Sequence, residues 1–157
     1  MKDVSMATLN ERLTADMKEA LRARESLRLS TIRLLLAALK NAQIEAMHPL
    51  SDEEALAVLR KQARMRHEAI EQYRKGGRED LASKEEAELA VIESYLPAAA
   101  TEDQIRAVVR EAIAATGASG PKDMGVVMRT TMSRLGGRAD GRQVQGLVRE
   151  ELAALGG

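Results

Sequence analysis

Basic side chains gather in the C-terminal third of the chain, around the sequence GGRADG at positions 136–141. Six basic residues and two aspartates lie between positions 122 and 149. Arginine suits phosphate because its planar guanidinium can donate two hydrogen bonds at once, and glycine lets backbone amides approach a phosphate closely. We predict that this segment binds RNA through seven residues, namely Lys122, Arg129, Arg134, Arg138, Arg142, Gly137 and Gly141.

Asp140 bears on where an anion could bind in this segment. We predict that it caps the helix that follows, whose N-terminus carries the positive end of a helix dipole. A carboxylate at that cap opposes a bound anion. We therefore expect Arg138 and Arg142, rather than the cap, to contact phosphate, while both can equally be ordinary solvated charges.

Two further groups of polar residues could form a catalytic or metal site. Four carboxylates lie close together on one predicted helix, and we place them on its solvated face: Glu85, Glu86, Glu88 and Glu93. His67 precedes Glu71 by four residues, a spacing that puts two metal ligands on one helix face. The chain offers no second ligand pair, since His48 lies in a predicted turn. We predict no catalytic residue, no metal and no cofactor.

The segment RKQARMRH at 60–67 places four basic residues within two helical turns: Arg60, Lys61, Arg64 and Arg66. Arg60 and Arg64 share one face and could meet a phosphate together. Mixed charge is ordinary on exposed helices. We therefore favour pairing of these residues with acids of neighbouring helices.

Composition limits the possible functions. The chain has 157 residues and no net charge, with 45% hydrophobic, 31% charged and 1% aromatic residues and no cysteine. This balance is typical of a folded protein, and the lack of cysteine excludes disulfides and thiol chemistry. Two tyrosines cannot build the aromatic platforms of single-strand binders. The sequence has neither an apolar run of about 18 residues nor a signal-peptide core, so we expect a cytoplasmic protein without membrane contact.

The hydrophobic pattern is helical nearly throughout, and no alternating run predicts a strand. Capping boxes predict helix starts at Thr8, Ser51 and Thr101, and prolines or glycines predict the ends. We predict seven helices, with these approximate limits: 8–21, 24–47, 51–76, 79–94, 102–116, 122–135 and 140–155. The expected class is all-α.

The segment LPAAATEDQ at 96–104 is the predicted domain boundary. We expect a four-helix domain at 1–97 and a three-helix domain at 98–157. In the second domain, Met124, Met128 and Met132 lie four residues apart and are expected to fill a small core. Gly125 and Gly146 are expected to permit a close crossing of two helices.

Several segments carry a resemblance to a known family. They are LLAALKNAQIE at 35–45, GGREDLA at 76–82, YLP at 95–97 and PKDMGVVMRTTMSRLGGRADGRQV at 121–144. Nearly the whole chain resembles the YqeY family, and the last of these segments is similar to the tail of GatB, a subunit of the glutamine-dependent aspartyl/glutamyl-tRNA amidotransferase. The resemblance implies an all-helical protein with a three-helix C-terminal unit of the kind that contacts transfer RNA.

The resemblance and the basic tail together suggest a transfer-RNA-binding module that is associated with the amidotransferase. The label of carbon–nitrogen ligase with glutamine as amide donor would then come from that association, because the machinery for the reaction lies in other domains. A protein–protein interaction adaptor without RNA binding is the alternative. A stand-alone ligase would need a cleft with perturbed carboxylates or histidine, which this sequence does not indicate.

Overall fold

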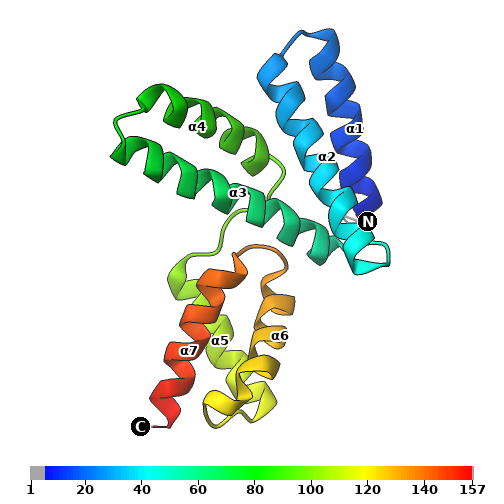
Figure 1. Cartoon of the computed structure of the whole chain (residues 1–157). Coiled ribbons are helices and arrows are strands. Elements are labelled where there is room, and N and C mark those ends of the chain that lie inside the picture. The colour runs from blue at the N-terminus through cyan, green and yellow to red at the C-terminus, as the bar shows by residue number, and fades with distance from the viewer. Residues whose placement is uncertain (1–5, 157) are drawn as a thin grey trace. The chain divides into compact units, whose positions relative to one another are not determined.

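The computed structural model describes residues 6–156, which fold into helices joined by turns and short loops. Seven α-helices and one short 3₁₀ turn account for the regular structure of this part of the chain (Figure 1). The predicted all-α class is confirmed. The chain divides into two compact units, one ending at Leu96 and the other beginning at Pro97.

The N-terminal unit consists of two antiparallel helical hairpins (Figure 1). The first pairs α1 (Met6–Arg22) with α2 (Ser26–Ala46), and the second pairs α3 (Asp52–Lys75) with α4 (Glu79–Glu93). Apolar positions three and four residues apart give each helix a face to bury, and all four helices contribute to one core. Its fully buried side chains include Leu13, Ile32, Leu35, Leu59 and Ile92.

The starts of α3 and α1 and the end of α2 can be compared with the helix limits that the sequence predicted. At Ser51, the predicted capping box is confirmed: its hydroxyl accepts from the Glu54 amide at 3.1 Å, and the Glu54 carboxylate accepts from the Ser51 amide at 2.9 Å. The capping prediction at Thr8 is wrong, because α1 already begins at Met6. Helix α2 ends at Ala46. The next residue, Met47, is its C-cap and adopts a left-handed backbone with φ of 61°.

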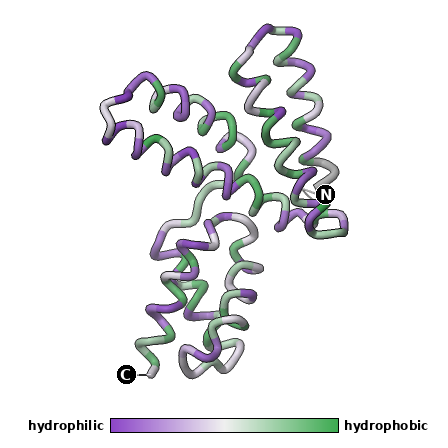
Figure 2. The backbone as a smooth tube through the Cα atoms, in the orientation of Figure 1, coloured by the Kyte–Doolittle hydropathy of each residue, from purple (hydrophilic) through white to green (hydrophobic). Residues whose placement is uncertain are grey.

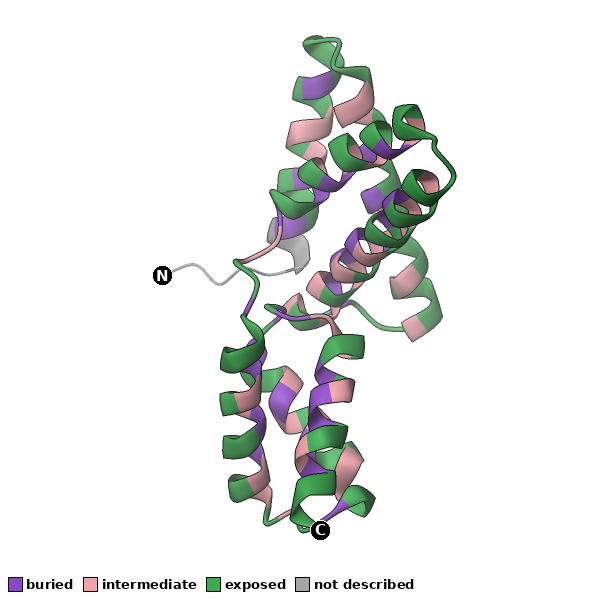
Figure 3. Cartoon of the chain, turned by 90° about the vertical axis from the view of Figure 1, so that its left-hand side faces the viewer, coloured by how far each residue is buried: buried purple, intermediate pink, exposed green. Residues whose placement is uncertain are grey.

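The C-terminal unit is a three-helix bundle of α5 (Glu102–Thr116), α6 (Met124–Leu135) and α7 (Gly141–Leu155), with the 3₁₀ turn η1 (Pro121–Asp123) before α6. Thr101 and Gln104 form the predicted capping box of α5. Gly117 ends α5 with φ of 69°, a conformation that favours glycine. Hydrophobic and hydrophilic residues alternate around each helix (Figure 2), and the buried residues recur along one side of it (Figure 3).

The methionine stripe of α6 belongs to the core of this unit. Met124, Met128 and Met132 are half-buried and pack against the cluster that contains Val127 and Val144. The close crossing predicted at Gly125 and Gly146 is wrong. A Cβ atom at Gly125 would meet only the Arg129 guanidinium, at 3.8 Å, and one at Gly146 would meet no atom within 4 Å.

Candidate functional site

The loop between α6 and α7 is shaped by its glycines. Gly136 and Gly137 have φ of 54° and 82°, a left-handed backbone that ends α6 and that other residues adopt only with strain. Asp140 occupies the N-cap position of α7, and its carbonyl accepts from the Val144 amide at 3.1 Å. The predicted cap position is therefore confirmed, but the Asp140 side chain makes no capping hydrogen bond.

Arg138 binds the segment that leads into α5. Its Nε donates to the Ala98 carbonyl at 3.3 Å and its Nη2 to the Gln104 side chain at 3.4 Å, while its own carbonyl accepts from the Ala100 amide at 2.7 Å. Two of its guanidinium nitrogens are therefore engaged within the unit. Sequence reasoning missed this role because these partners lie more than thirty residues away in the chain.

The other predicted RNA-binding side chains differ in how they are held. Arg134 pairs with Glu111 of α5 at 3.7 Å. Lys122, Arg129 and Arg142 are exposed. Arg129 makes no ion pair with another described residue. Lys122 belongs to η1, Arg129 to α6 and Arg142 to the first turn of α7. These three side chains carry positive charge within the basic segment at 122–149.

Two acids of α7, Glu150 and Glu151, pair with arginines of α5. Glu151 accepts from Arg106 Nη1 at 3.0 Å and from Arg110 Nε at 2.9 Å, and Glu150 accepts from Arg106 Nη2 at 3.2 Å. The hydrogen bonds from Arg110 and then from Arg106 hold the pKa of Glu151 below its usual range. Glu150 and Glu151 are thus paired with arginines of α5, while Lys122, Arg129 and Arg142 are exposed on η1, α6 and the first turn of α7.

A buried arginine links the two helices of the second hairpin. Arg66 of α3 is only 8% exposed. Its guanidinium lies 3.8 Å from Glu85 and 3.8 Å from Glu88 of α4, and its Nη1 donates to Gln62 at 3.0 Å. This confirms pairing for one residue of the RKQARMRH segment. The prediction that Glu85 and Glu88 lie on a solvated face is wrong, because their side chains are only 22% and 15% exposed and face Arg66.

A second polar cluster joins α1 and α2 to Tyr95, which follows α4 in the chain. The Tyr95 hydroxyl donates to Asp16, whose carboxylate lies 3.7 Å from Arg28 Nη2. The Arg12 guanidinium lies 5.2 Å from the centre of the Tyr95 ring. Burial, followed by the hydrogen bond to Asp16, raises the pKa of Tyr95 above its usual value. The cluster ties α1 and α2 to the segment that follows α4, and its contacts indicate a structural role.

We expect this cluster to make the N-terminal unit sensitive to alkaline pH. Since folding raises the pKa of Tyr95, the unfolded chain loses the phenolic proton first, and the stabilisation that is complete below pH of about 10 is lost as the pH rises further. The Tyr95→Phe variant should be about 1 kcal/mol less stable at pH 8 and should lose less stability between pH 9 and 11. Urea unfolding at several pH values measures both effects.

Tyr73→Phe provides the matched control for that experiment. Tyr73 is the other tyrosine of the chain and is half-buried in α3. Its variant should keep the alkaline loss of the original protein. An unchanged alkaline loss in Tyr95→Phe would contradict the assignment to Tyr95.

The histidines lie apart from any set of metal ligands. His67 Nε2 is 3.9 Å from Glu93 of α4, and His48 Nε2 is 3.6 Å from Glu54. Among the described residues, no three His, Asp or Glu side chains come together in a way that could hold a metal ion. No helix in this part of the chain is both long enough and apolar enough to cross a membrane.

Comparison with known proteins gives a family and several relatives. The family described as Yqey-like protein matches residues 10–152. The altered inheritance of mitochondria protein 41 of Pyrenophora tritici-repentis is 34% identical over 146 residues, which cover 91% of this chain and 80% of that protein. The proteins of the same name from Vanderwaltozyma polyspora and Lachancea thermotolerans are each 41% identical over 85 residues, covering 54% of this chain but only 46% of theirs. The match thus spans about half the length of these two relatives.

These relatives correct one expectation from the sequence. All three carry the word mitochondrial in their names. The predicted cytoplasmic location is therefore wrong. Composition misled the prediction because a balanced, cysteine-free chain is compatible with more than one compartment.

Proposed function

The chain belongs to the YqeY-like protein family, and from that membership we propose that it is a transfer-RNA-binding helical module that works with a transfer-RNA-dependent amidotransferase. The observation that carries this proposal is the distribution of charge in the C-terminal unit. Glu150 and Glu151 pair with Arg106 and Arg110 of α5, and the side chains of Lys122, Arg129 and Arg142 are exposed.

Such a surface suits a structured RNA. Folded RNA is recognised largely through its shape and its sugar–phosphate backbone, which requires spaced cations and no aromatic platform. The two tyrosines of the chain are unsuited to stacking on bases, because Tyr95 is buried and Tyr73 packs against the core. Arg138 contributes by fixing the loop that presents Arg142, and Gly137 contributes by allowing the turn.

We further propose that the isolated chain does not carry out glutamine-dependent carbon–nitrogen ligation. The polar clusters around Tyr95 and Arg66 bind helices to one another. The chain would then supply RNA contact to an enzyme whose reactive groups lie elsewhere. Glutaminase activity in the purified chain that is abolished by one point substitution would contradict this part of the proposal.

A titration of labelled, unmodified transfer RNA at two salt concentrations tests the RNA contact. The variant with Lys122→Ala, Arg129→Ala and Arg142→Ala should bind more weakly at low salt. Each lost phosphate contact should also reduce the slope of log K against log salt by about one. The control variant, with Arg33→Ala, Lys61→Ala and Lys84→Ala, removes the same charge from exposed positions of the N-terminal unit. Undetectable binding of the original chain, or equal weakening in the control, would reject the proposal.

The methionine stripe does not favour the alternative of a partner groove on α6. Met124, Met128 and Met132 pack against the core of their own unit. A partner protein therefore has to be sought on another surface of the chain.

A further inference from the structure

A groove lined by residues of α1 and α2 lies in the N-terminal unit. Its volume is about 370 Å³, and it is lined by Asn10, Leu36, Leu39, Lys40, Gln43 and Ile44. Three of the lining side chains are apolar, those of Leu36, Leu39 and Ile44, and three are polar, those of Asn10, Lys40 and Gln43. This combination is typical of grooves that accept an amphipathic helix.

Exposed apolar side chains continue from this groove to the end of α2. Leu36, Lys40 and Ile44 follow one another at intervals of four residues and so lie on one face of the helix. Ile44 is 65% exposed, and Met47, the residue on which the helix ends, is 90% exposed. These two exposed apolar side chains lie beside the groove, where a bound partner would cover them.

Met47 adds a second and independent observation. Its φ of 61° places it in the left-handed region, where the terminating residue of a helix is ordinarily glycine or asparagine. A methionine there strains the backbone, and its side chain, at 90% exposure, gains almost no contact within the chain. The side chain is therefore a cost to the isolated fold, and contact with another molecule would account for it.

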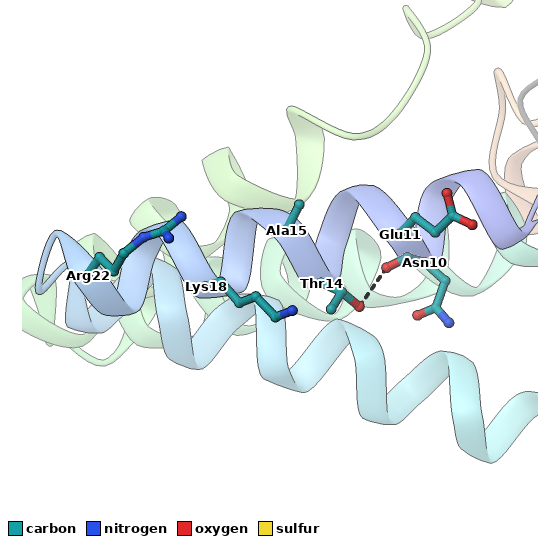
Figure 4. A pocket seen from close by; sticks show the side chains of 6 residues that line it. All are labelled: Asn10, Glu11, Thr14, Ala15, Lys18 and Arg22. Carbon is teal, nitrogen blue, oxygen red and sulfur yellow. Dashed lines mark hydrogen bonds between the residues drawn. The ribbon is translucent and has the colours of Figure 1, made fainter.

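Positive charge borders the same surface along α1. A second hollow of about 360 Å³ shares Asn10 with the groove and is lined by Asn10, Glu11, Thr14, Ala15, Lys18 and Arg22 (Figure 4). Lys18, Arg22 and Lys40 make no ion pair with another described residue. Glu11 is the one acidic residue among those that line the two hollows.

We propose that this surface of the α1–α2 hairpin binds an acidic amphipathic helix of a partner protein. Apolar residues of that helix cover Leu36, Ile44 and Met47, and its carboxylates face Lys18, Arg22 and Lys40. The distance along α1 from Asn10 to Arg22 is on the order of 18 Å, which corresponds to about three turns of a bound helix. An RNA would use the three cations but would leave Ile44 and Met47 uncovered, so the exposed apolar residues favour a protein.

This inference goes beyond the proposed function, because it concerns another unit and another class of partner. The test places the photo-crosslinking amino acid p-benzoylphenylalanine at Met47 of the full chain in cells, with the same substitution at exposed Lys84 of α4 as control. The crosslinked peptide is then sequenced. A peptide with apolar residues on one helical face and with acidic flanks is the expected product at Met47, and it should be absent at Lys84.

Variants of the full chain then test whether that peptide, made synthetically, binds as proposed. Ile44→Asp should weaken its binding on the order of tenfold or more, because one apolar side chain is no longer buried. Lys40→Glu should also weaken binding of the peptide. A peptide in which one acidic residue is replaced by lysine should restore the affinity for this variant. Both positions are exposed, so the melting temperature should change little.

Met47→Gly separates docking from folding. Relief of the left-handed strain should raise the melting temperature of the N-terminal unit by several degrees, roughly 4 °C, while peptide binding becomes weaker. If Met47 had only a structural role, its replacement would change the melting temperature but not the affinity for the peptide. A crosslink to nucleic acid, lipid or a second copy of the chain, no crosslink above the Lys84 control, or peptide binding that is insensitive to Ile44→Asp would each overturn the proposal.

Discussion

Replacement of Arg66 by methionine is expected to lower the free energy of unfolding of the N-terminal unit by about 3 kcal/mol. The methionine fills much of the same space, but it leaves the carboxylates of Glu85 and Glu88 partly buried, close together and without their shared cation. A domain of ordinary size has only about 5–15 kcal/mol of stability, so the loss should be plain in urea unfolding followed by circular dichroism.

Arg74→Met is the matched control for this substitution. Arg74 also lies on α3 and also pairs with two carboxylates, Glu79 and Glu86, but its side chain is 45% exposed. Exposed pairs contribute little because water solvates and screens the charges, so this variant should be far less affected. Addition of Glu85→Met and Glu88→Met to Arg66→Met should recover most of the lost stability, because no unpaired charge then remains buried. Equal effects of the Arg66 and Arg74 variants would show that burial does not control the strength of these pairs.

Leu152→Ala is expected to unfold most of the C-terminal unit while α1–α4 persist. Leu152 is fully buried in a core drawn from this unit alone. Truncation of a buried leucine costs about 3 kcal/mol through lost burial and the cavity left behind. A unit of this size rarely has more than about 3–5 kcal/mol of stability. Hydrogen exchange read by mass spectrometry should therefore show loss of amide protection in α5, α6 and α7.

Leu155→Ala makes the same chemical change three residues later on α7, at a position that is 50% exposed. It should leave amide protection in all helices nearly unchanged, since surface substitutions usually alter stability by less than about 0.5 kcal/mol. Parallel loss of protection in α1–α4 of Leu152→Ala would mean that the two cores unfold together.

Helix positions were largely predictable from the sequence because their signals are local. The capping boxes at Ser51 and Thr101 and the stop at Gly117 each depend on residues within one turn of the helix end. The start of α1 was misplaced, because a capping pattern at Thr8 does not prevent residues before it from continuing the helix. Periodicity likewise identified the buried residues of each helix, since the face that repeats every 3.6 residues is the face that packs.

The candidate site was predictable only as a set of residue types. The sequence alone placed Lys122, Arg129 and Arg142 together, since they lie close in the chain. It could not show that Arg138 would bind the Ala98 carbonyl, or that Arg106 and Arg110 would hold Glu150 and Glu151. These partners are more than thirty residues apart, and the packing of α7 and its preceding loop against α5 and its entry segment brings them together.

The sequence by itself thus determined an all-helical chain with a basic segment near its end, since helix signals and charge are read within a few residues. Tertiary structure decided which charges are neutralised and which remain exposed. Arg66 and Arg33 are both arginines on amphipathic helices, yet one is buried against two glutamates and the other faces solvent. The free energy of a charge depends on its distance from other charges and from water. Folding sets those distances, and the tertiary structure alone shows them.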